Sequence, residues 1–202
     1  MRTNVVGDLY ALPDHAFGLK SIIWWGLMGF MMIESMGFVL ALGAWVYIRG
    51  LNPSWPPPPD AVPGLIPGIV VTVLFLLSEV VNRWLAAQAK KKEDDHAVRL
   101  GVTAMLVLGL AIVVARMFEF PQLHTRWDVN AYGSVVWLLM FLHTLHLITD
   151  WIDTVVLGAW LYTHEIEPSQ HSEVYDNCGY WTFVVVSWLP IWFVVYIAPR
   201  VM

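Results

Sequence analysis

The sequence predicts an all-α integral membrane protein built as a bundle of five transmembrane helices. Of its 202 residues, 58% are hydrophobic and only 13% are charged, whereas a typical soluble domain has about 25% charged residues. The chain also contains twelve Trp, nine Phe and seven Tyr, and aromatic rings with a polar edge suit the two faces of a membrane. A water-soluble fold of this length would lack polar surface, so we expect lipid to be its solvent.

Five apolar segments are long enough to cross a membrane. An α-helix rises about 1.5 Å per residue and the hydrocarbon core is about 30 Å thick, so one crossing needs roughly 20 apolar residues. The segments that meet this length run approximately over residues 21–48, 62–87, 98–118, 132–161 and 179–197. No connection is long enough to separate two domains, so residues 1–202 are expected to form a single membrane domain.

The connections between these segments have distinct characters. The first reads LNPSWPPPPDAVPG, and its four consecutive prolines forbid a regular helix and favour an extended polyproline conformation. The second reads AKKKEDDH and is expected to be a solvated, charged turn. Pro190 lies inside the fifth segment, where the loss of one backbone hydrogen bond should kink the helix.

Lys and Arg residues predict the orientation of the bundle. Seven lie on the N-terminal side of the predicted membrane and four on the opposite side. The first group is Arg2, Lys20, Arg83, Lys90, Lys91, Lys92 and Arg99, and the second is Arg49, Arg116, Arg126 and Arg200. The positive-inside rule therefore predicts a cytoplasmic N-terminus, and five crossings place the C-terminus on the opposite side. We expect the inner membrane of a bacterium, with the C-terminus in the periplasm.

Three glutamates lie within or at the end of a predicted membrane helix. Glu34 lies midway along the first helix, Glu79 lies inside the second, and Glu119 ends the third. Ionisable groups at this depth are costly unless paired or hydrated, which makes each a functional candidate. Glu34 has two interpretations: a carboxyl kept neutral because burial disfavours its charged form, or a carboxylate that takes part in proton traffic.

A polar stripe follows the fourth helix. His143, His146, Asp150 and Asp153 are spaced i, i+3, i+7 and i+10, which places them on one helix face. Two His and two Asp could bind zinc or non-haem iron, or they could form a hydrogen-bonded seam against neighbouring helices. A di-iron bundle needs Glu-x-x-His pairs on two helices, and only this helix has such a stripe. The seam is favoured, and we assign neither a metal ligand nor a catalytic residue.

Haem and thiolate sites are disfavoured as well. His143 and His146 share one helix face, so they cannot approach a haem iron from opposite sides. Cys178 is the only cysteine, which excludes a disulfide or a Cys-based metal cage within the chain. No nucleotide-binding loop is present, and nothing points to nucleic acid. We therefore expect no cofactor in this chain.

Several separated motifs resemble subunit III of the haem-copper oxidases. Glu34 precedes GAWVYIR, which ends at Arg49, and SWPPPP, FLLSE, RMFEF and YGSVVWLLMFLHTLH follow in order. The last motif is HSEVYDNCGYWTFVVVSW, in which His171 stands ten residues before Trp181. Each motif is weak alone, but their order and spacing are similar to the family over residues 20–199. The chain resembles the five-helix short form of the family.

The chain departs from the family pattern at several polar positions. Glu79 and Asp150 stand where the family has Ser and Gly, and Thr182 and Val185 replace a His and an Asp. Met140 and Phe141 replace a Thr-Gly pair before the first His of the fourth helix. The acids Glu79, Asp150 and Asp153 are therefore where this member is expected to differ from its relatives.

The resemblance implies an accessory role in aerobic respiratory electron transport. It implies a cofactor-free subunit of a proton-translocating haem-copper terminal oxidase, beside subunits I and II, which hold the haem and copper. Such a subunit holds phospholipid and supports the proton uptake and durability of the catalytic subunit. Two alternatives stay open: a component of a nitric oxide reductase, and a stand-alone membrane metalloprotein that uses the stripe on the fourth helix.

The resemblance also suggests roles for individual residues. Glu34 matches the intramembrane carboxyl of the family, and His143, His146 and Glu119 would form the polar interior with it. Arg49 and Arg116 have the position and length for headgroup contacts. The lipid or subunit contacts are expected at Arg49, Arg116, His171 and Trp181.

Overall fold

A computed structural model describes residues 13, 16–58 and 60–201. Within these ranges the chain contains helices and no strand. The α-helices are α1 (Ile22–Leu51), α2 (Leu65–Lys91), α3 (Asp95–Glu119), α4 (Ala131–Thr163), α5 (Pro168–Trp192) and the short α6 (Ala198–Val201). Five helical stretches in this part of the chain are long and apolar enough to cross a membrane. The predicted all-α bundle of five membrane-crossing helices is confirmed.

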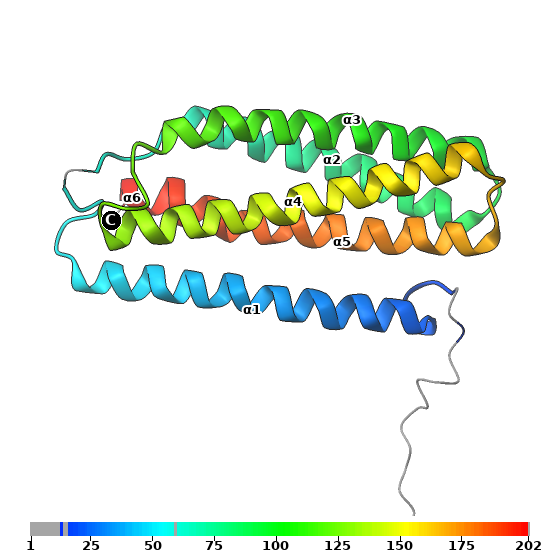
Figure 1. Ribbon diagram of the computed structural model, residues 1–202, viewed down its shortest axis with the longest axis horizontal. Coiled ribbons are helices and arrows are strands. Elements are labelled where there is room, and N and C mark those ends of the chain that lie inside the picture. Colours follow the sequence, from blue (N-terminus) through cyan, green and yellow to red (C-terminus); the bar gives the residue numbers. More distant parts are fainter. Residues whose placement is uncertain (1–12, 14–15, 59, 202) are drawn as a thin grey trace, which may run out of the picture.

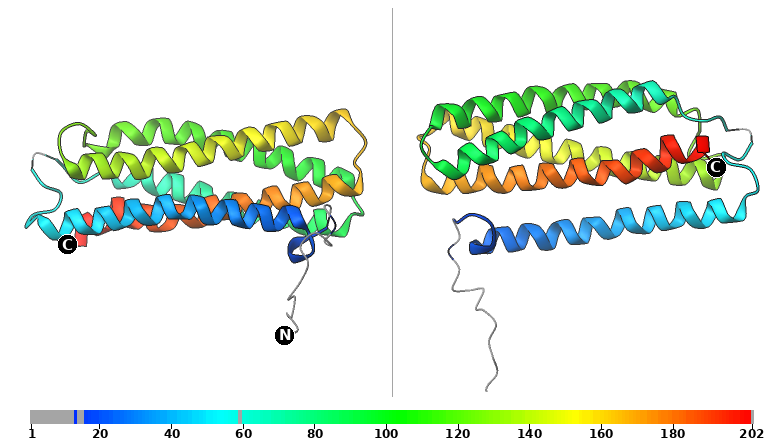
Figure 2. Two further views of the ribbon diagram at one scale, coloured as in Figure 1. Left: turned by 60° about the horizontal axis from the view of Figure 1, so that its bottom comes forward. Right: turned by 180° about the vertical axis from the view of Figure 1, so that it is seen from behind.

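Helix α1 lies at the side of the bundle. Figure 1 and both views of Figure 2 show α2, α3, α4 and α5 grouped together, with α1 running alongside α4 and α5. Only Phe38, Ala41 and Trp45 of α1 are buried, whereas Ile33 and Leu40 are 73% and 72% exposed. The outer face of α1 is therefore left for lipid or for a partner subunit.

The helix starts carry side-chain caps. The carboxylate of Asp94 and the amide oxygen of Asn130 each accept the backbone N–H three residues further on, at 3.0 and 2.8 Å. Glu167 and Gln170 form a reciprocal capping box at the start of α5. Caps of this kind satisfy backbone N–H groups that lack a partner within the helix. They fix where α3, α4 and α5 begin.

The first four helices begin and end within four residues of the predicted bounds, but α5 differs. It begins at Pro168, eleven residues before the predicted start at residue 179. The intervening stretch contains His171, Glu173 and Asp176, which lower its hydropathy without preventing a helix. At the other end, the disturbance expected at Pro190 takes the form of one π-helical turn, η4 (Phe193–Ile197).

Glycines allow the helices to approach one another closely. A Cβ atom added to Gly101 of α3 would lie 2.7 Å from Cδ1 of Leu85 in α2. A Cβ atom added to Gly68 of α2 would lie 2.9 Å from the ring of Tyr196 in η4. Small residues at such contacts are typical of packed membrane helices.

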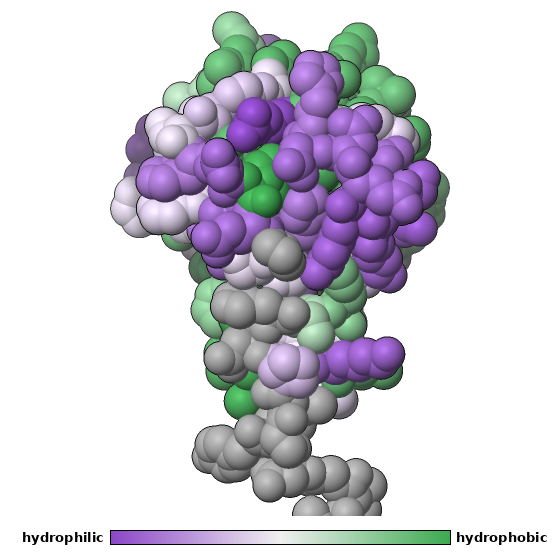
Figure 3. All heavy atoms as spheres, turned by 90° about the vertical axis from the view of Figure 1, so that its right-hand side faces the viewer, coloured by the Kyte–Doolittle hydropathy of each residue, from purple (hydrophilic) through white to green (hydrophobic). Residues whose placement is uncertain are grey.

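Hydrophilic residues gather at one end of the bundle. Figure 3 views the end where α2 turns into α3 and α4 turns into α5, and hydrophilic residues cover most of it. The exposed residues 91–96 of the charged turn lie here. Apolar residues flank this end in the same view, as expected where a polar cap meets a lipid-facing wall.

Candidate functional site

A hydrogen-bonded ion pair lies in the interior of the bundle. Nη1 of Arg116 in α3 is 2.5 Å from Oε2 of Glu119, and both side chains are fully buried. Nη2 of Arg116 is 2.8 Å from Nδ1 of His143 in α4. The hydroxyl of Tyr196 donates to Oε1 of Glu119 at 2.6 Å. This cluster, the Arg116 network, joins α3, α4 and η4.

The hydrogen bonds of His143 define its tautomer. Its Nε2 lies 2.9 Å from the carbonyl oxygen of Val184, and a carbonyl can only accept, so Nε2 carries a proton. Nδ1 must then accept from Arg116, which leaves the imidazole neutral. The guanidinium of Arg116 also lies 3.9 Å from the ring centroid of Trp188, a cation–π contact. Arg116 is thus held inside the protein by a carboxylate, an imidazole and an aromatic ring.

A second cluster joins α1 to the bundle. Nε2 of His146 in α4 is 3.1 Å from Oε1 of Glu34 in α1, and Tyr180 of α5 donates its hydroxyl to Oε2 of Glu34 at 2.7 Å. Nδ1 of His146 lies 2.7 Å from the carbonyl oxygen of Leu142. Glu34, His146 and Tyr180 form the α1 cluster, in which the carboxylate and the imidazole contact directly.

Glu34 and His146 lie close enough for a proton to pass between them. Nδ1 of His146 must donate to the carbonyl of Leu142. The contact between Nε2 and Oε1 of Glu34 is then a hydrogen bond only if one further proton is present, either on the carboxyl or on the imidazole. The two forms are a neutral acid beside a neutral imidazole and a carboxylate beside an imidazolium. Proton transfer between them requires no change of partner.

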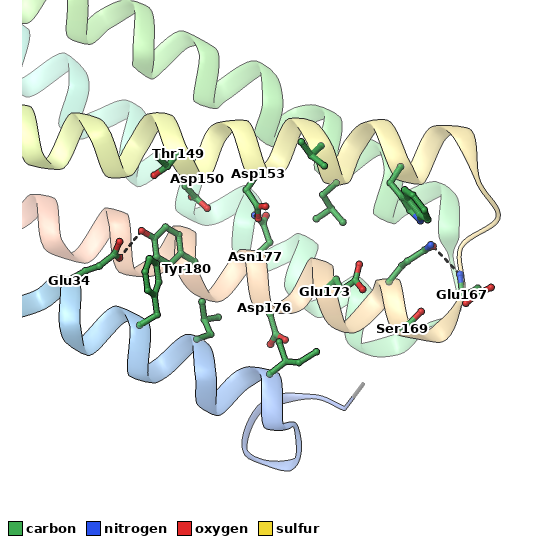
Figure 4. A pocket seen from close by; sticks show the side chains of 17 residues that line it. Glu34, Thr149, Asp150, Asp153, Glu167, Ser169, Glu173, Asp176, Asn177 and Tyr180 are labelled. Atoms are coloured by element: carbon green, nitrogen blue, oxygen red, sulfur yellow. Dashed lines mark hydrogen bonds between the residues drawn. The ribbon is translucent and has the colours of Figure 1, made fainter. Parts of the chain in front are cut away.

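A cavity of about 910 Å³ lies beside the α1 cluster, between α1, α4 and α5. Figure 4 shows Glu34 and Tyr180 at one end of it and Ser169 and Glu167 at the other, near the loop between α4 and α5. The acids that line it are Glu34, Asp150, Asp153, Glu167, Glu173 and Asp176. It extends from the α1 cluster toward the hydrophilic end of the molecule.

The predicted stripe on α4 divides among separate environments. His143 belongs to the Arg116 network, His146 contacts Glu34, and Asp150 faces the cavity. Asp153 accepts a hydrogen bond from Nδ2 of Asn177 at 3.3 Å. Within the described ranges, no three His, Cys, Asp or Glu side chains gather as a metal site would require. His143, His146 and Asp153 contact different partners, so the stripe does not converge on one point.

Two of the residues that depart from the family pattern contact each other. The hydroxyl of Thr182 in α5 lies 3.1 and 3.2 Å from the two carboxylate oxygens of Glu79 in α2. Arg83 and Asn82 also donate to Glu79, at 2.8 and 3.2 Å. The extra acid in α2 is therefore compensated by donors on its own helix and on α5.

Three of the four expected lipid or subunit contacts lie inside the protein. Arg116 is fully buried in the Arg116 network, and His171 and Trp181 are only 4% and 2% exposed. His171 Nε2 lies 3.3 Å from Asp95 at the start of α3, and the indole N–H of Trp181 donates to Ser78 of α2 at 3.0 Å. The three side chains are thus directed toward neighbouring helices of this chain, and their role as lipid or subunit contacts stays a prediction.

Arg49 does lie at a helix end. It is near the C-terminus of α1, where Nη1 donates to the carbonyl of Asn52 at 2.9 Å, and its guanidinium is 6.0 Å from the ring centroid of Trp55. Tyr180 and Tyr196 complete the two clusters, and neither was predicted from the sequence. They are 146 and 77 residues away from the carboxyl groups they bind, so no local motif could have indicated them.

The fold and the two clusters together are those of a multi-pass membrane protein. Five helices that are long and apolar enough to cross a membrane carry paired polar groups between them, which is the arrangement of a multi-pass membrane protein. The profile of the family described as Cytochrome c oxidase subunit III matches residues 4–199. The chain belongs to this family.

Individual relatives agree with the family match. The chain is 25% identical over 190 residues to "Cytochrome c oxidase subunit 3" of Thermostichus vulcanus, covering 93% of this chain and 92% of that protein. It is 25% identical over 189 residues to the protein of the same name in a Synechocystis strain, covering 89% and 77% of the two chains. A "Probable cytochrome c oxidase subunit 3" of Mycobacterium leprae is 24% identical over 201 residues, or 96% and 98%.

The chain is therefore a subunit III of a haem-copper oxidase, and the resemblance found in the sequence is confirmed. The family assignment implies a complex with the other oxidase subunits. A nitric oxide reductase component and a stand-alone metalloprotein are not favoured by these matches.

Proposed function

We propose that this subunit supports proton uptake by the catalytic subunit of a proton-translocating oxidase and prolongs its activity during turnover. The contact between Glu34 and His146 supports this role most directly, because it places a carboxyl and an imidazole 3.1 Å apart, within reach of proton exchange. A pair of this kind can take up and release a proton without a large rearrangement. The chain itself needs no haem or metal for this.

The position of the pair favours exchange with water at one side of the membrane. Glu34 lines the cavity that extends to Glu167 and Ser169, near the charged end of the molecule seen in Figure 3. The positive-inside rule favours a cytoplasmic location for this end, and so places the N-terminus in the cytoplasm and the C-terminus in the periplasm of a bacterial inner membrane. The cavity would then collect protons from the cytoplasmic side.

The proposed partners are the haem-copper subunit I and subunit II, which would hold the haem and copper. The outer face of α1, with Ile33 and Leu40 largely exposed, is a surface that lipid or subunit I could cover. Phospholipid headgroups are proposed to meet Arg49 at the end of α1, where Arg can snorkel toward them.

Replacing Glu34 with Gln in the assembled oxidase tests the proton role. Gln keeps the size of the side chain but cannot exchange a proton with His146. We expect unchanged haem content, together with slower proton uptake or a shorter lifetime during turnover, measured by stopped-flow pH indicators and by prolonged oxygen consumption. The matched control is Glu79→Gln, because Glu79 is also intramembrane but its partners are Arg83, Asn82 and Thr182.

Two results would contradict the proposal. Loss of haem from the complex with Glu34→Gln would mean that Glu34 is needed for assembly of the catalytic subunit. Equal effects of Glu34→Gln and Glu79→Gln on proton uptake would mean that any intramembrane carboxyl of this chain has the same influence. The contact between Glu34 and His146 would then have no role of its own in proton uptake.

A further inference from the structure

Two carboxyl oxygens inside the cavity between α1, α4 and α5 lack a partner. Asp150 is 3% exposed and Asp176 is 8% exposed, and neither Oδ2 of Asp150 nor Oδ1 of Asp176 has a hydrogen-bond partner among the described residues. Both residues line the cavity, and Figure 4 shows their side chains directed into it. A buried carboxyl oxygen without a donor is costly, so the cavity suits a ligand that brings N–H or O–H donors.

The carboxyl groups of the lining follow one another along the cavity. From the α1 cluster to the loop between α4 and α5, Figure 4 shows them in the order Glu34, Asp150, Asp153, Asp176, Glu173 and Glu167. Asp150 and Asp153 are three residues apart on α4, and Glu173 and Asp176 are three residues apart on α5. Three residues span about 4.5 Å along a helix. Negative charge therefore recurs about once per helical turn.

This lining fits a cation whose charge is spread along its length. None of the described residues around the cavity is Lys, Arg or His, so the protein does not neutralise these acids there. Within the described ranges, no three His, Cys, Asp or Glu side chains converge as a metal ion requires. A single inorganic ion would meet too few of the carboxyl groups at once, whereas positive charges at intervals would meet them in turn.

The wall between the acids is apolar and aromatic. Leu27 of α1 and Val156 and Leu157 of α4 offer alkyl surface to the cavity. Phe30 and Tyr180 also line it, and their rings stack with centroids 6.0 Å apart. Methylene groups pack against alkyl surface, and ammonium groups are attracted to aromatic faces. A chain that alternates methylene and ammonium groups matches both parts of the wall.

We propose that this cavity binds a linear aliphatic polyamine from the aqueous phase, with its ammonium groups on Asp150, Asp153 and Asp176 and its methylene groups against α1 and α4. Polyamines have three or four methylene groups between successive nitrogens. At bond lengths near 1.5 Å these span about 5–6 Å, which matches the interval between the acids. A primary ammonium has three N–H donors, so it satisfies a carboxyl oxygen that the protein leaves without one.

The size and position of the cavity agree with such a ligand. Its volume of about 910 Å³ lies within the range of roughly 300–1,000 Å³ that is usual for small-molecule sites. It extends toward the hydrophilic end of the molecule seen in Figure 3, which gives a water-soluble ligand access. The proposal does not rest on the proton role of Glu34, because binding is measured without turnover.

Equilibrium binding of amines to the purified, assembled oxidase tests the charge pattern. The probes are spermidine, putrescine and butylamine, which share a butyl unit and carry three, two and one ammonium groups. We expect a saturable site that binds spermidine about tenfold or more tightly than butylamine, because each further ammonium adds hydrogen bonds to charged groups. Equal binding of the two amines would overturn the proposal. Displacement of spermidine by equimolar Mg²⁺ would show diffuse charge attraction and would overturn it as well.

Charge-matched variants assign the binding to the cavity. Asp150→Asn combined with Asp176→Asn should weaken spermidine binding about tenfold or more. Glu93→Gln combined with Glu165→Gln removes the same charge from exposed acids outside the cavity and should leave spermidine binding unchanged. An equal loss in the two double variants would show general attraction to an acidic surface and would refute the site.

A single variant carries the test if the double variant of Asp150 and Asp176 does not assemble. Asp153 is exposed and accepts a hydrogen bond from Asn177 at 3.3 Å, so Asp153→Asn should leave the fold intact. It should weaken spermidine binding several-fold, because it removes one carboxylate of the row. Unchanged affinity for spermidine in Asp153→Asn would then overturn the proposal.

Native mass spectrometry of the same complex identifies what occupies the cavity. We expect spermidine to add to the wild-type complex as a discrete mass and to be absent from the double variant of Asp150 and Asp176. A phospholipid that is bound to the wild type and lost from the double variant, without any spermidine adduct, would show that lipid fills the cavity and would refute the polyamine.

Discussion

Replacing Arg116 with Met removes the central cation of the interior while keeping an unbranched side chain. Arg116 and Glu119 are both fully buried and 2.5 Å apart, and Arg116 also contacts His143 and Trp188. Breaking a buried pair by removing one partner costs about 3–5 kcal/mol, because the other charge stays buried without compensation. Tyr196 would still donate to Glu119, but one neutral donor does not replace a cation.

The assay is thermal unfolding of the complex in mild detergent, followed by the fluorescence of the buried tryptophans. For a chain of this length each kcal/mol shifts Tm by about 2–4 °C, so the loss of about 3–5 kcal/mol predicts a decrease of roughly 6–20 °C. The combined variant Arg116→Met and Glu119→Gln should recover most of that decrease, because it removes both charges together.

The matched control is Arg126→Met. Arg126 also forms an ion pair, with Asp128 at 2.8 Å, but its side chain is 75% exposed, and exposed pairs contribute little. No measurable shift of Tm is expected for it. A decrease in Arg116→Met no larger than that of Arg126→Met would refute the inference that burial makes the Arg116 network structural. A combined variant less stable than Arg116→Met alone would refute the assignment of the penalty to an uncompensated Glu119.

Two smaller perturbations test the packing and the α1 cluster. Gly68→Ala places a Cβ atom 2.9 Å from the ring of Tyr196. Overpacking of this kind should destabilise the subunit by about 1–3 kcal/mol in the same thermal assay. The control is Gly43→Ala, where an added Cβ atom meets no neighbouring side chain of the described residues within 4 Å, and it should be neutral or slightly stabilising. Tyr180→Phe removes the donor to Glu34 at 2.7 Å and should cost about 1 kcal/mol, and an unchanged Tm would show that this hydrogen bond does not help to hold α1.

The sequence was sufficient to predict the number, order and approximate length of the helices, because apolar length is a local property. It failed at the start of α5, where His171, Glu173 and Asp176 interrupt the apolar run. A prediction based on hydropathy therefore begins the helix only after these residues. The capping box formed by Glu167 and Gln170 was the local signal that could have extended it.

The partners of the polar groups were not predictable from the sequence. Arg116 was expected at the headgroups because it lies near the end of an apolar segment. Its burial depends on His143, which is 27 residues away, and on Trp188, which comes from another helix. A residue near a helix end can turn toward lipid or toward the bundle, and only the neighbouring helices decide which.

The acids that distinguish this chain from the family pattern therefore differ in whether the protein supplies them with hydrogen-bond partners. Glu79 is balanced within the protein by Arg83 and Thr182, so it can be explained as part of the contact between α2 and α5. Asp150 is 3% exposed and lines a cavity, and its Oδ2 has no hydrogen-bond partner among the described residues. The packing of the helices therefore accounts for Glu79, whereas in the described part of the chain it leaves one carboxyl oxygen of Asp150 without a donor.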